Sequence, residues 1–284
     1  MLKWRVGDVT ITRIVEWEGP AMPGGFPFAT PDALRQMPWL SPHFVDAKGQ
    51  LLMSIHALLI ETPIARLIVD TCIGNDKPRP LPQWNDLQGE FLKDLETAGC
   101  PRESIDFVVC THLHVDHIGW NTMLVDGVWK PTFPNARYLI GKDEYSFWSS
   151  RPTDKIENRP WGFEDSVVPI LESGLADFVA SDHRVTEEVS LEPTPGHTPG
   201  HVSVRIRSKG EEALITGDFL HHPCQFTHPE WTTSVDNDPE ATVSTRRRVF
   251  ASLETDHALV IGTHFPKPTA GRLTREGDAW RFEV

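Results

Sequence analysis

Residues 111–119 read T-H-L-H-V-D-H-I-G, and this run decides much of what the chain can fold into and do. It places three imidazoles and one carboxylate within six residues, at His112, His114, Asp116 and His117. Imidazole and carboxylate together suit borderline divalent metals such as zinc. The preceding I-D-F-V-V-C at 105–110 is a short apolar run that predicts a buried strand. The four polar residues therefore belong to a loop at a strand's carboxyl end, where open α/β sheets place their sites.

The composition is that of a globular protein with an acidic surface. The chain has 284 residues, of which 39% are hydrophobic and 24% charged. This length and balance allow a full hydrophobic core in one large domain or two small ones. The formal net charge of −13 disfavours a polyanion such as nucleic acid as the main partner. A small anionic substrate stays compatible, because a metal centre would carry its own positive field.

Cysteine spacing and hydropathy predict a protein of a reducing, aqueous compartment. The four cysteines are widely spaced and form no C-x-x-C motif, which indicates buried thiols rather than a disulfide framework; they are Cys72, Cys100, Cys110 and Cys224. The first residues, M-L-K-W-R-V-G-D-V-T, carry charge at once and lack the apolar core of a signal peptide. Since no stretch approaches the ~18 apolar residues of a membrane span, we expect a cytoplasmic protein with no membrane partner.

Residues 19–50 form the least regular part of the first half. They include G-P-A-M-P-G-G-F-P-F-A-T-P, and a short helix is expected after it from Asp32 to Met37. A loop of this length in a compact domain is usually functional or disordered. Its aromatic residues, Phe26, Phe28 and Trp39, favour an ordered lid or a contact in a homodimer. The alternative is a loop that packs on its own surface.

Hydrophobic periodicity elsewhere predicts two similar halves. In the first half it predicts strands over 4–18, 52–61, 64–69 and 105–110, and a helix over 86–98. In the second half it predicts helices over 141–148 and 239–253, and strands over 136–140, 178–180, 183–186, 189–193, 201–207, 212–218 and 258–264, before the final R-L-T-R and A-W-R-F-E-V. Strands meander at the start of each half and helices follow. The pattern therefore predicts two β-sheets faced by helices in a single domain over 1–284.

Three later stretches of sequence also place a metal-compatible residue at the end of a predicted strand, as the 111–119 run does. P-T-P-G-H-T-P-G-H at 193–201 places His197 in a turn after a strand. T-G-D at 216–218 places Asp218, and G-T-H-F-P at 262–266 places His264, each at the end of an apolar strand. A lone H-x-H would be a weak signal, whereas seven ligand-type residues in four ordered blocks are not expected by chance.

This ordered set resembles the metal-binding pattern of the metallo-β-lactamase-fold hydrolases, and the match spans residues 70–264. The resemblance implies an α/β fold, an αββα sandwich of two mixed β-sheets packed face to face with helices on the outer faces. It implies two divalent metal ions per chain, with zinc expected first and manganese, cobalt or iron as alternatives. The implied ligands are His112, His114 and His197 for one ion and Asp116, His117 and His264 for the other, with Asp218 as the bridge.

The implied ligand set describes a hydrolase. Two neighbouring divalent ions lower the pKa of a shared water, and the bridging hydroxide so formed attacks a carbonyl or phosphoryl centre. Asp116 and Asp218 are then the carboxylates of the catalytic centre. Asp70, in the early V-D-T run, is implied to orient a ligand histidine, with a turn cap as the alternative. No G-x-S-x-G elbow or P-loop suggests another nucleophile.

The residues after Asp218 resemble one branch of the family, that of methyl parathion hydrolase and related lactonases. The similar stretches are F-L-H-H-P-C-Q-F-T-H-P-E-W, D-N-D-P-E-A at 236–241 and G-T-H-F-P-K-P at 262–268. Aromatic and imidazole residues near the implied ligands predict a mainly apolar pocket for a small-molecule substrate with an apolar portion; these are Trp120, His221, His222, Phe226, Trp231 and Phe265. Core packing is the alternative for each of them.

The sequence departs from the well-studied N-acyl homoserine lactone lactonases at one position. Those enzymes carry a tyrosine shortly after the bridging aspartate, whereas here that neighbourhood holds His221 and His222, and the only tyrosines are Tyr138 and Tyr145. A histidine N–H can polarise a substrate carbonyl in the same way, and a packing pair is the alternative.

Four functional hypotheses follow from this resemblance. We expect hydrolysis of a lactone or a carboxylic ester, and the nearest alternative is an organophosphate triesterase. An iron-dependent redox member of the fold is a hypothesis of another class, which the retained histidine set opposes. A nucleic-acid-processing member is opposed by the net charge of −13.

Overall fold

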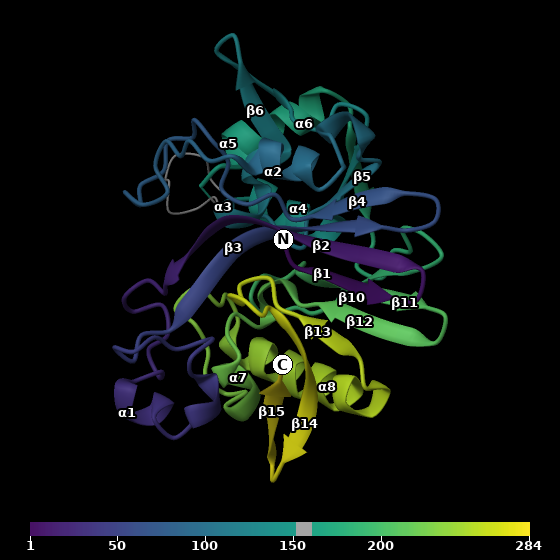
Figure 1. Cartoon of the computed structure of the whole chain (residues 1–284). Helices are drawn as coiled ribbons and strands as arrows, with labels where there is room; N and C mark the ends of the chain where they lie inside the picture. Colours follow the sequence, from purple (N-terminus) through teal and green to yellow (C-terminus); the bar gives the residue numbers. More distant parts are fainter. Residues whose placement is uncertain (152–160) are drawn as a thin grey trace.

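A seven-stranded sheet forms one of the two central layers in the computed structural model, which describes residues 1–151 and 161–284 (Figure 1). Its strands, in spatial order, are β1 (Lys3–Val6), β2 (Val9–Pro20), β3 (Leu52–Glu61), β4 (Arg66–Val69), β5 (Phe107–Val109), β8 (Arg137–Gly141) and β9 (Ala176–Val179). Strands β1 to β4 pair antiparallel, and β4, β5, β8 and β9 run parallel. The parallel connections are long, as such crossovers must be, and they carry helices.

A six-stranded sheet forms the second layer. Its strands, in spatial order, are β10 (Val189–Pro193), β11 (Val202–Ser208), β12 (Glu211–Ile215), β13 (Leu259–Ile261), β14 (Ala270–Glu276) and β15 (Ala279–Glu283). All neighbours pair antiparallel except β12 and β13, which are parallel. A separate hairpin joins β6 (Thr122–Val125) to β7 (Val128–Pro131).

Helices cover the outer faces of both sheets (Figure 1). The α-helices are α1 (Pro31–Leu34), α2 (Phe91–Thr97), α3 (Val115–Ile118), α4 (Lys142–Ser149), α5 (Phe163–Ser166), α6 (Val168–Glu172), α7 (Cys224–Thr227) and α8 (Pro239–Asp256). Short 3-10 helices are η1 (Pro38–Leu40), η2 (Arg102–Ser104), η3 (Gly119–Asn121) and η5 (Gly217–Phe219). Within the described ranges, no helix is long and apolar enough to cross a bilayer.

Three apolar layers hold this sandwich together, and strand periodicity explains them. Successive side chains of a strand point to opposite faces. On β3, Leu59 therefore packs under α2 and α4, whereas Leu58 and Ile60 face the second sheet. On β12, Ile215 faces the first sheet and Leu214 packs toward α8. Both faces of each sheet are buried, so its central strands are apolar almost throughout. The αββα fold predicted from the sequence is confirmed.

The structure corrects several predicted boundaries. The helix expected over 86–98 begins only at Phe91, and Asp86 is excluded from it by a left-handed backbone conformation (φ 48°). The strand expected over 183–186 is a single bridge between Arg184 and Ser190. The β6–β7 hairpin was missed, although Asp126 and Gly127, both at positive φ, form the Asp-Gly turn that favours hairpins.

Residues 19–50 pack against the outer face of the second sheet. Leu40 and Phe44 belong to the same apolar cluster as Phe219 and Phe226. Phe26 stands edge-on to the imidazole of His221, with ring centroids 6.2 Å apart, while Phe28 is 51% exposed. The segment is thus ordered against the body of the protein. A lid or homodimer role for it stays a prediction.

Candidate metal centre

Four loops at the carboxyl ends of strands bring the ligand-type residues together. The loop after β5 and helix α3 carry the histidine run, and the loop after β10 carries His197. Asp218 lies in η5 just beyond β12, and His264 follows β13. Strands β12 and β13 end at Ile215 and Ile261, short of the predicted 218 and 264. Both residues therefore lie in turns outside the sheet, where their side chains can meet the other loops.

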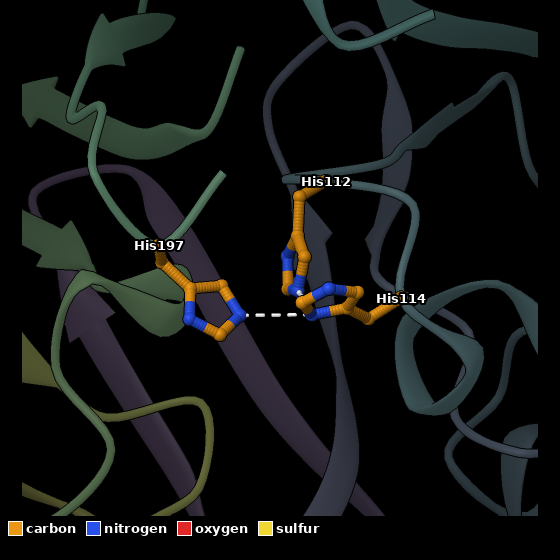
Figure 2. A group of neighbouring side chains, drawn as sticks. All are labelled: His112, His114 and His197. Carbon is orange, nitrogen blue, oxygen red and sulfur yellow. Dashed lines mark hydrogen bonds between the residues drawn. The ribbon is translucent and has the colours of Figure 1, made fainter. Parts of the chain in front are cut away.

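Three imidazoles converge in the first half of the centre. Figure 2 shows His112, His114 and His197 pointing toward one another from two loops far apart in the sequence. His114 Nδ1 lies 3.0 Å from His112 Nε2 and 2.9 Å from His197 Nε2. Both His112 and His197 are fully buried. Three ring nitrogens so placed can bind one ion together.

Two imidazoles and a carboxylate form the second half. His264 Nε2 lies 3.2 Å from His117 Nε2 and 3.7 Å from Asp116 Oδ2. His117 Nε2 is 3.8 Å from Asp116 Oδ1. The side chain of Asp116 is 16% exposed, whereas that of His117 is 1% exposed. The carboxylate of Asp116 therefore marks the side of the centre that solvent reaches.

One oxygen of Asp218 lies between the two halves. Asp218 Oδ2 is 3.8 Å from His112 Nε2 and 3.6 Å from His197 Nε2 in the first half. It is 3.2 Å from His117 Nε2 and 3.1 Å from His264 Nε2 in the second. The other oxygen, Oδ1, is buried without a hydrogen-bond partner among the described residues. A buried carboxylate with an unpaired oxygen is costly, and a cation would satisfy it.

The outward ring nitrogens have oxygen partners that fix how the rings face the centre. His117 Nδ1 donates to Asp70 Oδ2 at 2.8 Å, and His264 Nδ1 donates to the carbonyl of Ser54 at 2.9 Å. His197 Nδ1 donates to Asp236 Oδ1 at 3.0 Å. A carbonyl or carboxylate only accepts, so in the neutral rings the inward Nε2 atoms carry lone pairs. In these neutral rings the converging lone pairs fit a divalent cation, and the outer contacts are those that orient metal ligands.

Burial and charge set the protonation of the cluster. Burial lowers the pKa of His114 to about 3 and that of His197 to about 4, so both are neutral, which is the form that binds metal. Burial disfavours the charged form of His117 too, but the neighbouring Asp218 and Asp116 carboxylates outweigh it and raise its pKa. Burial also opposes ionisation of Asp218, yet the His117 and His264 rings hold its pKa well below the usual range.

Asp70 and the two neighbouring histidines after Asp218 have distinct surroundings. Asp70 holds His117 and also accepts hydrogen bonds from the backbone and hydroxyl of Thr111, each at 2.8 Å. The imidazole rings of His221 and His264 are stacked, with centroids 5.7 Å apart. The ring of His222 faces away, where Nε2 donates to the carbonyl of Phe44. Only the first of these two histidines is brought to the metal centre.

The structure places the predicted aromatic pocket residues in the hydrophobic core. Trp120 stacks on Phe91 and donates its indole N–H to Glu16 at 2.7 Å. Phe226 and Phe265 are fully buried and pack against Phe282. Like His222, these side chains support the walls of the centre and do not line it. Trp231, which is partly buried, stacks on His228 at the edge of the apolar cluster on the outer face of the second sheet.

Several residues that position the centre were not predicted. His201 accepts a hydrogen bond from the backbone N–H of Asp218 at 2.7 Å, and Asp236 holds His197. A weak signal existed for both, since His201 closes the 193–201 motif and Asp236 opens the quoted 236–241 stretch. Glu144 is a buried acid and Glu16 a half-buried one behind the loops, and nothing in the sequence separates them from the surface acids of an acidic protein.

Comparisons with known proteins agree with this geometry. The model of the metallo-beta-lactamase superfamily matches residues 52–264. An N-acyl homoserine lactonase of a Bacillus species is 25% identical over 185 residues, 60% of this chain and 66% of that protein. The N-acyl homoserine lactonase of Bacillus thuringiensis is 22% identical over 231 residues, 76% of this chain and 83% of that protein.

Solved structures share the whole architecture. The crystal structure of hydrolase AbOPH in the beta lactamase superfamily superimposes with a TM-score of 0.79 and 25% identity, covering 99% of this chain and 95% of that one. AidC, a dizinc quorum-quenching lactonase, gives a TM-score of 0.78 with 23% identity, covering 99% and 96%. The second likeness concerns the fold alone.

The chain belongs to the metallo-β-lactamase superfamily, whose model covers most of its length. This confirms the family predicted from the four ordered sequence blocks. The lactonases and metallo-hydrolases among its relatives also confirm the prediction of a metal-dependent enzyme that hydrolyses ester bonds.

Proposed function

We propose that this chain is a dinuclear-metal hydrolase that opens a lactone or cleaves a carboxylic ester, with N-acyl homoserine lactones as the first substrates to test. The observation that carries the proposal is the position of Asp218 Oδ2, within 3.1 to 3.8 Å of a ring nitrogen in both halves of the centre. One carboxylate so placed can serve two ions at once. The substrate class is supported by the relatives named N-acyl homoserine lactonases.

We assign each half of the centre to one ion. In this assignment His112, His114 and His197 hold the first ion, Asp116, His117 and His264 hold the second, and Asp218 bridges them. Two divalent ions, zinc being the expected pair, would activate water as the nucleophile and polarise the scissile carbonyl. Asp70, Asp236 and the carbonyl of Ser54 keep the rings oriented. Asp116 faces the solvent side, where it can accept a proton as water is consumed.

His221 is the residue we propose to face the substrate. Its side chain is about 6% exposed, and neither ring nitrogen makes a hydrogen bond within the described parts of the chain. Its Nε2 lies 3.2 Å from Asp218 Oδ2, which places the ring beside the reacting centre. An N–H donor there can stabilise the charge that develops on the lactone carbonyl. Phe26, edge-on to the same ring, offers an apolar surface to the rest of the substrate.

Several broader properties belong to the same proposal. The described chain shares one interlayer core between its two sheets, which supports a single domain over residues 1–284. All four cysteines are buried and unpaired, which supports a reducing compartment such as the cytoplasm. Met22 and Phe28, in the segment 19–50, are exposed apolar side chains that a second copy of the chain can cover.

A substrate panel tests the proposed function. Purified protein loaded with zinc, manganese or cobalt is assayed on N-acyl homoserine lactones, simple lactones, aryl esters, phosphotriesters and a β-lactam. We expect the highest kcat/KM on a lactone or aryl ester, and loss of that activity after chelation. Preference for a phosphotriester by tenfold or more would reassign the substrate class, and activity that survives chelation would contradict the metal-dependent mechanism.

The adjacent histidines supply a matched pair of variants. We expect His221→Ala to lower kcat on the preferred lactone by about 10²-fold while metal content is kept, because a donor to the developing oxyanion is lost. His222→Ala serves as the control, since its ring nitrogens hydrogen-bond the carbonyl of Phe44 and the backbone N–H of Cys224, away from the metal centre. That variant should lower thermal stability with kcat nearly unchanged. Equal effects of both substitutions on kcat would refute the role of His221.

A further inference from the structure

Glu144 is a buried acid that lies outside the set of ligand-type residues. It sits in the first turn of α4 and is 1% exposed. Glutamate is almost never buried this completely unless its oxygens are paired. Both oxygens are paired here, and all of the donors are neutral groups. The carboxylate therefore acts as a hydrogen-bond acceptor for its surroundings rather than as half of an ion pair.

The donors to Glu144 come from both loops that carry the three-histidine half. Oε1 accepts from the backbone N–H of Leu113 at 3.0 Å, and Leu113 lies between His112 and His114 in the chain. Oε2 accepts from the hydroxyl of Thr198 at 2.7 Å and from the backbone N–H of Gly200 at 3.2 Å. Thr198 follows His197 directly. One side chain thus links the loop after β5 to the loop after β10, immediately behind their ligand-type residues.

Two further contacts make this link rigid. Trp148 Nε1 donates to Oε1 of Glu144 at 2.6 Å, and the Trp148 ring packs against His114 with centroids 5.5 Å apart. At Gly200, an added Cβ would overlap the backbone of Glu144. The loop after β10 therefore lies directly on α4, and the side chain of Glu144 fixes both the approach of the two loops and the face of the His114 ring.

We infer that Glu144 is a positioning residue that sets the geometry of the His112–His114–His197 half of the centre. This inference rests on the proposed ligand assignment and goes beyond it, because it assigns control of one half to a residue that binds no ion. Its donors do not include residues of the Asp116–His117–His264 half. Loss of the carboxylate should therefore weaken metal binding at the three-histidine half and leave the other half nearly unchanged.

The test measures metal affinity in single-site backgrounds. Cobalt(II) is titrated into metal-free protein, and binding is followed by its visible absorption. In a His264→Ala background, which leaves the three-histidine half, Glu144→Gln should weaken cobalt affinity by 10- to 100-fold, the range typical when partners of ligands are lost. In a His197→Ala background, which leaves the other half, the same substitution should change affinity by less than about threefold, because Glu144 accepts no hydrogen bond from a ligand-type residue of that half.

Two more variants separate this role from a general loss of structure. Glu16→Gln alters a half-buried acid that also has neutral donors, the backbone N–H groups of Ile73 and Gly74 and the indole of Trp120. In the His264→Ala background, Glu16→Gln should leave cobalt affinity within about threefold of that of His264→Ala alone, because the donors to Glu16 lie outside the three-histidine half. Thr198→Val removes one donor to Glu144 and should give a smaller loss confined to the three-histidine half. If Glu144→Gln does not fold, Thr198→Val decides the question.

The outcomes separate this inference from the proposed function. Wild-type protein that binds no cobalt would contradict the proposed centre itself. Wild-type protein that binds two ions, together with equal losses at both halves or no loss at either in Glu144→Gln and Thr198→Val, would overturn only the positioning role.

Discussion

Substitution of Asp218 by alanine should abolish hydrolysis and lower the metal content from two ions to one or none per chain. Its Oδ2 is the one carboxylate oxygen among the described residues that lies within 3.8 Å of ring nitrogens from both halves. Without it, the two ions would lose their shared anionic ligand and face each other's charge. We expect kcat/KM to fall by at least ~10³-fold, as removal of a central electrostatic group often does.

Asp218→Asn provides the matched control for this prediction. The amide keeps the shape and one oxygen, and the backbone N–H of residue 218 still donates to His201. Since the negative charge is lost but the fold is retained, this variant should keep part of its metal and little activity. Metal analysis and steady-state kinetics check both variants. Full activity in Asp218→Ala would refute the bridging role.

Substitution of Gly119 by alanine should unfold or severely destabilise the protein. Gly119 ends the histidine run, and an added Cβ would overlap the carbonyl group of Ile73, which is backbone and cannot move aside. The backbone N–H groups of Gly119 and Trp120 donate to Cys72 and Thr71, each at 2.7 Å, so the two segments lie in direct contact. We expect the free energy of unfolding to fall by about 3 kcal/mol or more. Metal binding should be lost with it.

Gly89→Ala is the control for the glycine substitution. Its Cβ would meet only Asn75 Oδ1, at an ordinary contact distance of 3.7 Å. The change in the free energy of unfolding should stay within about 1 kcal/mol, as for most surface substitutions. Denaturant unfolding followed by circular dichroism measures both variants. Gly119→Ala as stable as Gly89→Ala would contradict the packing of the histidine loop on residues 71–74.

The fold was predictable because its determinants are local. The apolar runs of β3, β5 and β12 mark buried strands by composition alone, and the histidine run, the 193–201 turn, T-G-D and G-T-H each follow such a strand. Chemistry and position marked these residues as metal-compatible, and the resemblance to the family implied which of them share an ion. Which side chains meet across the two sheets, however, depends on pairing between segments more than 80 residues apart, as for His114 and His197.

What could not be predicted is the environment of individual side chains. His221 and His222 are adjacent and chemically identical, yet one ring faces the centre while the other donates to Phe44. Phe226 and Phe265 are the right kind of residue for a substrate pocket, but the apolar cluster on the outer face of the second sheet buries both. Glu144 and Asp236 resemble surface acids in the sequence. In each case the direction of one side chain decides the role, and the packing of distant elements sets that direction.

The central claim, that two ions share the Asp218 carboxylate in a hydrolytic centre, is tested most directly by metal analysis of the wild-type protein. The protein is expressed with metal in excess, freed of loosely bound ions and compared with Asp218→Ala. We predict two divalent ions per wild-type chain. The rate of lactone hydrolysis should rise in proportion to the occupancy of the second metal site. One ion or none in fully active protein would contradict the account.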